Sequence, residues 1–384
     1  MRVYFDNAAT TPISNEVIEV MTSCLKDHYG NPSSIHADGR RVRAALEEAR
    51  KTVAQCIGAS IGEIFFTSGG TESNNMALKC AVRDLGVTRI ISSPTEHHCI
   101  LHTLENLAQH HNIKVEYLEV CSKGKASLEE LEELLATSAE PTLVSLMHAN
   151  NEIGTMLDLD KVANICAQYN AFFHSDTVQT IGHFPIDVDK TKIHFLAGAA
   201  HKFHGPKGVG FIYINGDVSI KPFIDGGAQE RNMRGGTENV YGIVGLAKAL
   251  ELYASQMEER KKHIEGIRDY MSDELIENFQ DIHFNGDIEG PRLYTVLSVS
   301  FPASPKSEMM LLSLDISGIS ASGGSACSSG AETGSHVMQA TNAEVGRKTI
   351  RFSFSHYNTK EEVDFVVEKL KSIVAQPIKV SAAQ

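Results

Sequence analysis

The first two-thirds of the chain alternates short apolar runs with segments of helical periodicity. The apolar runs, which we predict to be strands, lie at 64–66, 89–91, 115–118, 142–146, 171–173, 194–196 and 209–213. A helical pattern follows Ser14, with an apolar face made of Val17, Ile18, Met21 and Leu25. A longer helical pattern runs from about 40 to 57 and ends at Gly58. This alternation predicts a largely parallel sheet covered by helices on both faces.

The pattern changes after about Ala254. A charged helix at 257–278 precedes shorter, less regular strands and a final helix at 360–374. Because 384 residues exceed the usual size of one domain, we expect two. The first is an α/β domain at 15–255 with a mainly parallel seven-stranded sheet. The second is a smaller α+β domain formed by 1–14 and 256–384.

Composition and charge narrow the classes of protein and partner. Apolar residues make up 42% and charged residues 22%, as in ordinary globular proteins. The net charge of −13 argues against direct binding of nucleic acid or anionic lipid. No apolar run is long enough for a membrane span, and the first residues lack a secretory signal. Seven scattered cysteines without a C-x-x-C pair argue against a disulfide framework or a metal site and favour a cytoplasmic location.

Two polar groups lie where ligands gather, at the carboxyl ends of the predicted strands. Lys202 lies in a loop between two predicted strands, where a lysine can form a Schiff base with an aldehyde cofactor. The alternative is a solvated loop lysine. Asp176 ends the strand at 171–175, with Gln179 three residues later. A carboxylate there could pair the ring nitrogen of pyridoxal phosphate or simply cap a helix.

A glycine-rich turn and a histidine pair follow two further strands. The turn at 67–75 opens a helix, whose free N–H groups and dipole attract phosphate. It lacks the Gly-Lys-Thr ending of a nucleotide-binding P-loop. His97 could lie flat against a planar ring. His98 and His102 are four residues apart and could share a metal, but without an evident third ligand we favour a charged helix surface.

Two residues near the C-terminus complete the candidate chemistry. Cys327 lies among small polar residues at 322–330 that cannot bury a thiol. An exposed cysteine in the cytosol is a liability unless it is used, so a reactive role is favoured over an incidental one. Arg351 opens an extended run at 351–354, where its guanidinium could hold a substrate carboxylate. A surface ion pair is the alternative for Arg351.

Together these segments resemble the cysteine desulfurases, fold-type-I pyridoxal-phosphate enzymes of the class V aminotransferase group. The match covers nearly the whole chain in the family's order. Its motifs are Tyr4–Thr11, Gly30–Ser34 with His36, Thr71–Asn74, Thr95–His97, Asn150–Gly154, Asp176 with Gln179, His201–Lys202, Arg234–Thr237 and Gly324–Cys327. The distance from Cys327 to the next motif resembles the branch with a mobile cysteine loop, whose members hand sulfur to scaffold proteins directly.

The resemblance implies removal of sulfur from L-cysteine, giving L-alanine and a persulfide on Cys327. The sulfur would pass to an acceptor such as an iron–sulfur cluster scaffold or a tRNA thiolation protein. The implied catalytic residues are Cys327, Lys202 as the Schiff-base lysine, and His97. The implied cofactor-binding residues are Lys202, Gly70, Thr71, His97, Asn151, Asp176, Gln179, His201 and Thr237. Arg351 and Asn31 would bind the substrate carboxylate.

The resemblance also implies a homodimer, because Thr237 would reach the cofactor of the neighbouring subunit. One position departs from the family pattern. Ala199 stands where a Ser or Thr usually contacts the phosphate. Two alternatives stay open. A selenocysteine lyase or an aminotransferase of the same fold would share Lys202 and Asp176 without needing Cys327. A non-catalytic module would keep only the fold.

Overall fold

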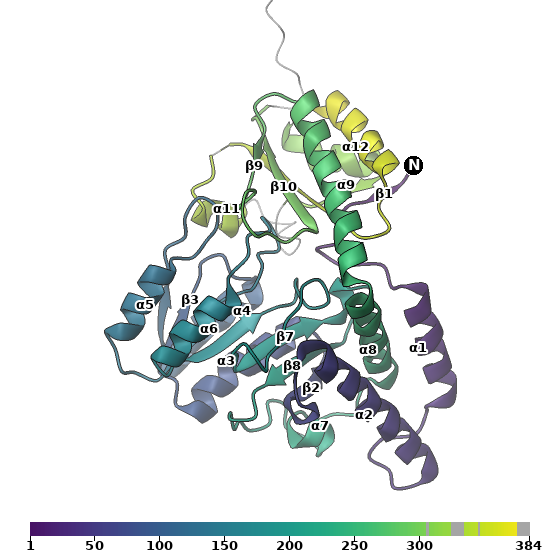
Figure 1. Cartoon of the computed structure of the whole chain (residues 1–384), viewed down its shortest axis with the longest axis vertical. Coiled ribbons are helices and arrows are strands. Elements are labelled where there is room, and N and C mark those ends of the chain that lie inside the picture. Colours follow the sequence, from purple (N-terminus) through teal and green to yellow (C-terminus); the bar gives the residue numbers. More distant parts are fainter. Residues whose placement is uncertain (305–306, 324–333, 345, 375–384) are drawn as a thin grey trace, which may run out of the picture.

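The computed structural model describes residues 1–304, 307–323, 334–344 and 346–374. A seven-stranded sheet forms the centre of the larger, lower part of the molecule (Figure 1). In spatial order its strands are β2 (Ile64–Thr67), β8 (Gly210–Ile214), β7 (Phe195–Ala199), β6 (Phe172–Asp176), β5 (Thr142–Ser145), β3 (Arg89–Ser92) and β4 (Lys114–Tyr117). Each predicted apolar run is one of these strands.

The sheet is mainly parallel, as predicted. Neighbouring strands from β7 to β4 are parallel. Strand β8 is antiparallel to both of its neighbours, β2 and β7. Strands β2, β3, β5, β7 and β8 are buried along their whole length, which explains their continuous apolar runs. At the edge of the sheet, β4 is only partly buried.

Alternate side chains of the strands enter two separate hydrophobic cores. Ile91 and Val144 belong to one core, whereas their neighbours Ile90 and Leu143 belong to the other. The first core is covered by α1 (Asn15–Asp27), α2 (Ala37–Ile57), α5 (Leu128–Ala136), α6 (Leu159–Gln168) and α8 (Val240–Ser255). The second is covered by α3 (Gly70–Leu85) and α4 (His98–His111). The two-residue period of a strand therefore builds the expected layers.

The predicted apolar face of α1 is partly wrong. Val17 and Cys24 are buried and Met21 packs against the same core. Ile18 and Leu25 are instead 46% and 56% exposed. The helix presents only a narrow stripe to α8, so residues next to that stripe face outward.

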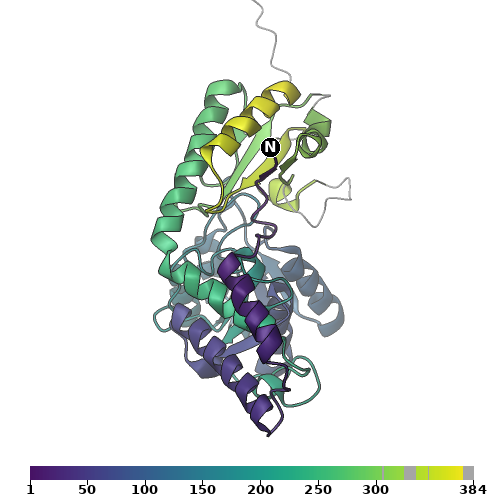
Figure 2. The same cartoon turned by 90° about the vertical axis from the view of Figure 1, so that its right-hand side faces the viewer.

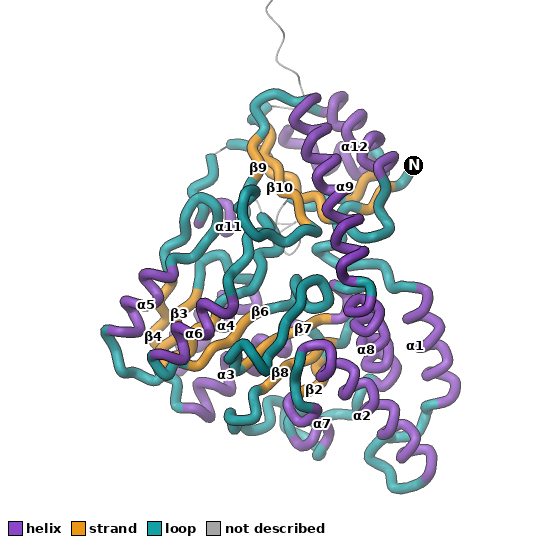
Figure 3. Tube along the Cα trace, in the orientation of Figure 1, coloured by secondary structure: helices purple, strands orange, loops and turns teal. Residues whose placement is uncertain are grey.

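A smaller set of elements lies above the large sheet (Figures 1 and 3). Its sheet has the order β12 (Lys348–Ser353), β10 (Val296–Phe301) and β9 (His283–Phe284), all antiparallel. A parallel pair, β1 (Val3–Tyr4) and β11 (Ile319–Ser320), lies in the same part. The helices are α9 (Met257–Asn278), α10 (Met310–Ile316), α11 (His336–Ala340) and α12 (Lys360–Ile373). The two long helices agree with the predicted ranges to within one residue.

The N-terminal segment packs with these C-terminal elements (Figure 2). Val3 and Phe5 are buried in one hydrophobic cluster with side chains from Ile264 to Val374. Phe5 also makes an edge contact with Phe352, at a ring-centroid distance of 6.3 Å. Residues 6–11 follow this buried segment and lie across the end of the large sheet. None of the helices in the described ranges is long and apolar enough to cross a membrane.

Candidate active site

A cavity of about 250 Å³ lies where β6 and β7 end and α3 begins. It collects side chains from segments far apart in the sequence. Nine of the predicted site residues line it, namely Gly70, Thr71, His97, Asn151, Asp176, Gln179, His201, Lys202 and Arg351. Ala199, the residue that departs from the family pattern, lines it as well. The cavity therefore lies at the carboxyl ends of parallel strands, the place where ligands usually bind such sheets.

Lys202 is presented by a single helical turn, Ala200–Lys202, directly after β7. Its Nζ donates hydrogen bonds to the carbonyl oxygens of Ala8 and Ala9, at 2.6 and 2.9 Å. The side-chain amide of Gln179 donates to the same Ala8 carbonyl, at 3.1 Å. The N-terminal segment thus positions the lysine and the glutamine beside each other.

Asp176 is the last residue of β6 and is almost fully buried. Its Oδ1 accepts a hydrogen bond from the backbone N–H of Val178, at 3.0 Å. Its Oδ2 accepts one from the side-chain amide of Asn74, at 2.7 Å. Two donors on separate oxygens stabilise a carboxylate, the form that pairs with a protonated ring nitrogen.

The N-terminus of α3 supplies an anion site at one end of the cavity. Gly69, its N-cap, provides no side-chain cap, so N–H groups of the first turn are left for a ligand. A Cβ at Gly70 would lie 2.5 Å from Cγ2 of Val178, so a larger residue there would force Val178 to move. This glycine lets the backbone approach closely, which suits a phosphate group.

Burial disfavours the charged form of two histidines at the cavity. Burial lowers the pKa of His97, an effect that the nearby Asp176 carboxylate partly offsets. The His97 Nδ1 accepts from the backbone N–H of Cys99, at 3.2 Å, so its Nε2 carries the proton. Burial also lowers the pKa of His201, to about 4. The His201 Nδ1 lies 3.2 Å from Oγ1 of Thr10.

Arg351 lies inside β12, not at the start of a strand as predicted, and only 1% of it is exposed. Its Nη2 donates to Oδ1 of Asp6, at 2.8 Å, and its Nη1 to the carbonyl of Asn151, at 3.0 Å. Its Nε is buried without a hydrogen-bond partner in the described part of the chain. Since buried donors are nearly always paired, this N–H fits a ligand that the cavity takes up.

Three predicted residues are not placed in the cavity. Asn31 lies exposed between α1 and α2, where its Oδ1 accepts from the backbone N–H of Ser33, at 2.8 Å. Thr237 is exposed in the loop before α8. Neither lines the cavity of its own chain. Cys327 lies outside the described residues.

The residues that flank the segment of Cys327 lie close to the cavity. The backbone N–H of Arg351 donates to the carbonyl of Ser322, at 2.7 Å. The Ser322 hydroxyl donates to Asp6, at 2.8 Å, on the same carboxylate oxygen that Arg351 binds. On the other side, the Ser335 hydroxyl donates to Oε2 of Glu152, at 2.5 Å.

Sequence patterns missed some residues that shape this site. Asp6, Ala8 and Ala9 belong to the motif at 4–11, to which the sequence assigned no role, and they contact Arg351 and Lys202. Asn74 lies in the motif at 71–74. The polar pair Asp6-Asn7 followed by small residues was the available signal for the first of these segments.

The histidines on α4 do not form a metal site in the described residues. The ring of His98 lies 5.3 Å from that of His102 and 4.5 Å from that of His336, between centroids. Within the described ranges, however, no group of three His, Cys, Asp or Glu side chains could hold a metal ion.

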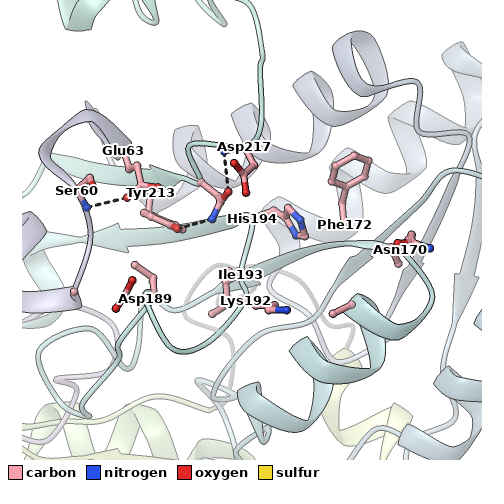
Figure 4. Close-up of a pocket in the computed structure, with 15 residues that line it drawn as sticks. Ser60, Glu63, Asn170, Phe172, Asp189, Lys192, Ile193, His194, Tyr213 and Asp217 are labelled. Atoms are coloured by element: carbon pink, nitrogen blue, oxygen red, sulfur yellow. Dashed lines mark hydrogen bonds between the residues drawn. The ribbon is translucent and has the colours of Figure 1, made fainter.

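A second cavity, of about 540 Å³, lies at the opposite edge of the same sheet (Figure 4). It is lined by Phe172 and His194, near the starts of β6 and β7, and by Tyr213, near the end of β8. The Tyr213 hydroxyl accepts a hydrogen bond from the side-chain amide of Asn215, at 3.1 Å. None of the predicted site residues lines this cavity.

Comparison with known proteins agrees with this geometry. Residues 3–366 match the family model "Aminotransferase class-V". The cysteine desulfurase IscS of Dictyoglomus turgidum is 44% identical over 97% of this chain and 94% of its own length. The putative cysteine desulfurase IscS 1 of Bacillus subtilis is 39% identical over 97% of this chain and 98% of its own length.

Solved structures give the same result. A NifS-like protein superposes with a TM-score of 0.90 and 39% identity, over 97% of this chain and 99% of that chain. An apo cysteine desulfurase from Thermococcus onnurineus NA1 gives a TM-score of 0.85 at 25% identity, over 97% and 94%. The chain therefore belongs to the class-V aminotransferase family and, within it, to the cysteine desulfurases.

Proposed function

We propose that this protein takes sulfur from L-cysteine onto Cys327 with the help of bound pyridoxal phosphate, releasing L-alanine. The observation that carries the proposal is the shared cavity of Lys202, Asp176 and the glycine turn of α3. An amine, a carboxylate and an anion site are the three groups that an aldehyde cofactor with a ring nitrogen and a phosphate requires.

The residues present fit this cofactor. Lys202 would bind its aldehyde carbon, Asp176 its ring nitrogen, and Gly70 with Thr71 and His201 its phosphate. The orphaned Nε of Arg351 fits a carboxylate from the substrate. When bound, pyridoxal phosphate supplies an electron sink that activates the Cβ–S bond of the substrate.

The protein's own side chains would orient the reactants and move protons. The Lys202 amine, which the carbonyl groups of Ala8 and Ala9 hold at the cavity, would take a proton from the substrate and return one. The neutral His97 would lie against the ring, with Asn151 and Gln179 beside it. Arg351 would hold the substrate carboxylate and so set its orientation.

Cys327 would be the nucleophile. Its thiolate attacks the substrate sulfur, so that an S–S bond forms and the Cβ–S bond breaks. The electron pair of the broken bond stays on the alanine fragment, which is protonated at Cβ. Cysteine and the Cys327 thiol thus become alanine and a Cys327 persulfide, without an outside oxidant.

The cysteines in the described ranges support this choice. Among them only Cys99 lines the cavity, and burial raises its pKa to about 12. Burial also raises the pKa of Cys80 and Cys166 to about 12. Since the thiolate is the reactive form, these thiols are poor nucleophiles.

The finer features of the function follow from the same assignment. We propose a homodimer, because Thr237 is exposed and does not line the cavity of its own chain. We also propose that the protein acts in the cytoplasm. Residues 15–255 would form the cofactor-binding domain, and 1–14 with 256–384 the domain that carries the cysteine segment. The persulfide sulfur would go to an acceptor protein such as an iron–sulfur scaffold.

The test is to incubate the cofactor-loaded protein with L-cysteine and a reductant and to measure alanine and sulfide. We expect equal amounts from the unchanged protein and neither product from Cys327→Ala. Cys99→Ala is the matched control and should retain turnover. Turnover of cysteine by Cys327→Ala would refute the nucleophile. Activity on selenocysteine that survives Cys327→Ala, with none on cysteine, would favour a selenocysteine lyase instead.

A further inference from the structure

A line of buried hydrogen bonds runs from Asp176 away from the cavity and into the core. Asn74 joins Asp176 to His174, whose Nε2 lies 3.1 Å from the Asn74 Oδ1. The His174 Nδ1 lies 2.9 Å from the hydroxyl of Ser145. Asn74, His174 and Ser145 are all fully buried. We refer to these three residues as the buried relay.

The chemistry of each group fixes the direction of every proton. A carboxylate can only accept, so Asn74 presents its amide nitrogen to Asp176 and its Oδ1 to His174. His174 must then carry its proton on Nε2, which leaves Nδ1 as an acceptor for the Ser145 hydroxyl. Burial lowers the pKa of His174 to about 3, which agrees with a ring that carries one proton. Each donor in the relay therefore points toward Asp176.

We infer that Asn74, His174 and Ser145 are positioning residues that hold Asp176 as an oriented anion, ready to keep the cofactor's ring nitrogen protonated. The inference rests on pyridoxal phosphate lying in the cavity as proposed. It extends that proposal to residues outside the cavity, because Asn74 lines the cavity but His174 and Ser145 do not.

Asn74 also connects the relay to the phosphate end of the cavity. It lies four residues after Gly70, one turn along the helix that begins at the phosphate site. Because Asn74 also binds Asp176, a single helix sets both the phosphate end and the ring-nitrogen end of the cofactor. His174 and Ser145 belong to the neighbouring strands β6 and β5, so they tie this helix to the sheet.

Other titratable groups face Asp176 but are not part of the relay. They are His97 and Cys99 at the start of α4, Glu96 just before it, and Lys202 after β7. Glu96 is fully buried, and this burial raises its pKa well above the usual range. Because burial lowers the pKa of His174 to about 3, removal of His174 changes the support of Asp176 without removing a neighbouring charge.

The experiment measures the ring nitrogen directly. Each protein is loaded with pyridoxal phosphate labelled with ¹⁵N in the ring, and the ¹⁵N chemical shift is followed against pH without substrate. In His174→Phe we expect the pH at which the ring nitrogen loses its proton to fall by up to about one unit, the scale of one neutral hydrogen bond, because the lost bond joins His174 to the neutral side chain of Asn74. Ser145→Ala, which removes one hydroxyl, should shift it less and in the same direction.

His174→Gln keeps an amide donor and should recover part of the shift. His194→Phe is the matched control. His194 lies at the opposite edge of the sheet, and its ring accepts a hydrogen bond from the backbone N–H of Phe173, not from the relay. It should leave the ring nitrogen unchanged. An unchanged ¹⁵N titration in Ser145→Ala and in a folded, cofactor-bearing His174→Phe would overturn the inference. Failure of the unchanged protein to bind the cofactor would instead overturn the proposed function.

Discussion

The substitution Glu230→Gln would break an ion pair that is closed off from solvent. Arg50 on α2 donates from Nη1 and Nη2 to the two carboxylate oxygens of Glu230, at 2.7 and 3.0 Å. Both side chains are 3% exposed. The Glu230 carboxylate also accepts from the backbone N–H of Phe66, at 2.7 Å. The pair thus joins α2 and β2 to the short turn that precedes Thr237.

The backbone of this turn needs the support. Glu230, Arg231 and Asn232 have φ values of 45°, 55° and 66°, in the left-handed region that non-glycine residues avoid. Such residues cost about 1–3 kcal/mol each and persist only where the surroundings hold them. Removing one partner of a buried pair costs about 3–5 kcal/mol, because the other charge stays buried without compensation. We expect a loss of that size in the free energy of unfolding.

Urea unfolding followed by circular dichroism measures this loss, with Glu47→Gln as the control. Glu47 binds Arg50 and Arg231 in the same cluster, at 3.2 and 2.6 Å, but its side chain is 43% exposed. An exposed pair contributes about 1 kcal/mol or less. Equal losses in the two variants, or a loss below about 1 kcal/mol in Glu230→Gln, would refute the argument from burial.

Three further outcomes are expected. Ala199→Ser should restore a phosphate contact worth about 0.5–1.5 kcal/mol and lower the cofactor's Kd by roughly 2–13-fold in equilibrium dialysis; an unchanged Kd would contradict it. Since burial disfavours the imidazolium of His97, the acid limb of kcat/KM should lie below pH 6.5, and a limb at higher pH would contradict a role for its neutral form. Burial lowers the pKa values of His148, His174 and His183 to about 4, 3 and 4, from 6.5 in the unfolded chain. The unfolded state therefore binds more protons as the pH falls from 6.5 to about 4, and each histidine should lower stability by up to about 1.4 kcal/mol per pH unit. Urea midpoints at pH 7 and pH 5 test this, and equal midpoints would contradict it.

The strands and long helices could be predicted because their patterns are local. The run at 142–146 is buried on both faces, so each of its positions is apolar or small, and it is one of the seven strands. Helix α2 ends at Gly58, whose φ of 70° suits the left-handed cap that glycine favours. The exposure of Ile18 and Leu25 on α1 could not be predicted, because the width of the buried stripe depends on how α8 packs against this helix.

The candidate site residues at strand ends could be predicted for a related reason. Asp176 ends one buried strand and Lys202 follows another, and the sheet brings such positions to one edge. Their partners belong to no local pattern. Asp6 and Arg351 are 345 positions apart, and the bond between them exists because the N-terminal segment packs with the C-terminal elements. A pattern that spans a few residues carries no information about that contact.

This distribution of contacts has a consequence for how the site is assembled. The large sheet alone brings Asp176, Lys202 and the turn at Gly70 to one edge. The carbonyl groups that hold Lys202 come from residues 8 and 9, and the carboxylate that holds Arg351 comes from Asp6. Residues 6–11 are in turn placed by Val3 and Phe5, which are buried among side chains from 264 onward. The half of the site that we propose to bind the cofactor therefore depends mainly on the sheet, whereas the half that we propose to bind the substrate forms only once both ends of the chain have come together.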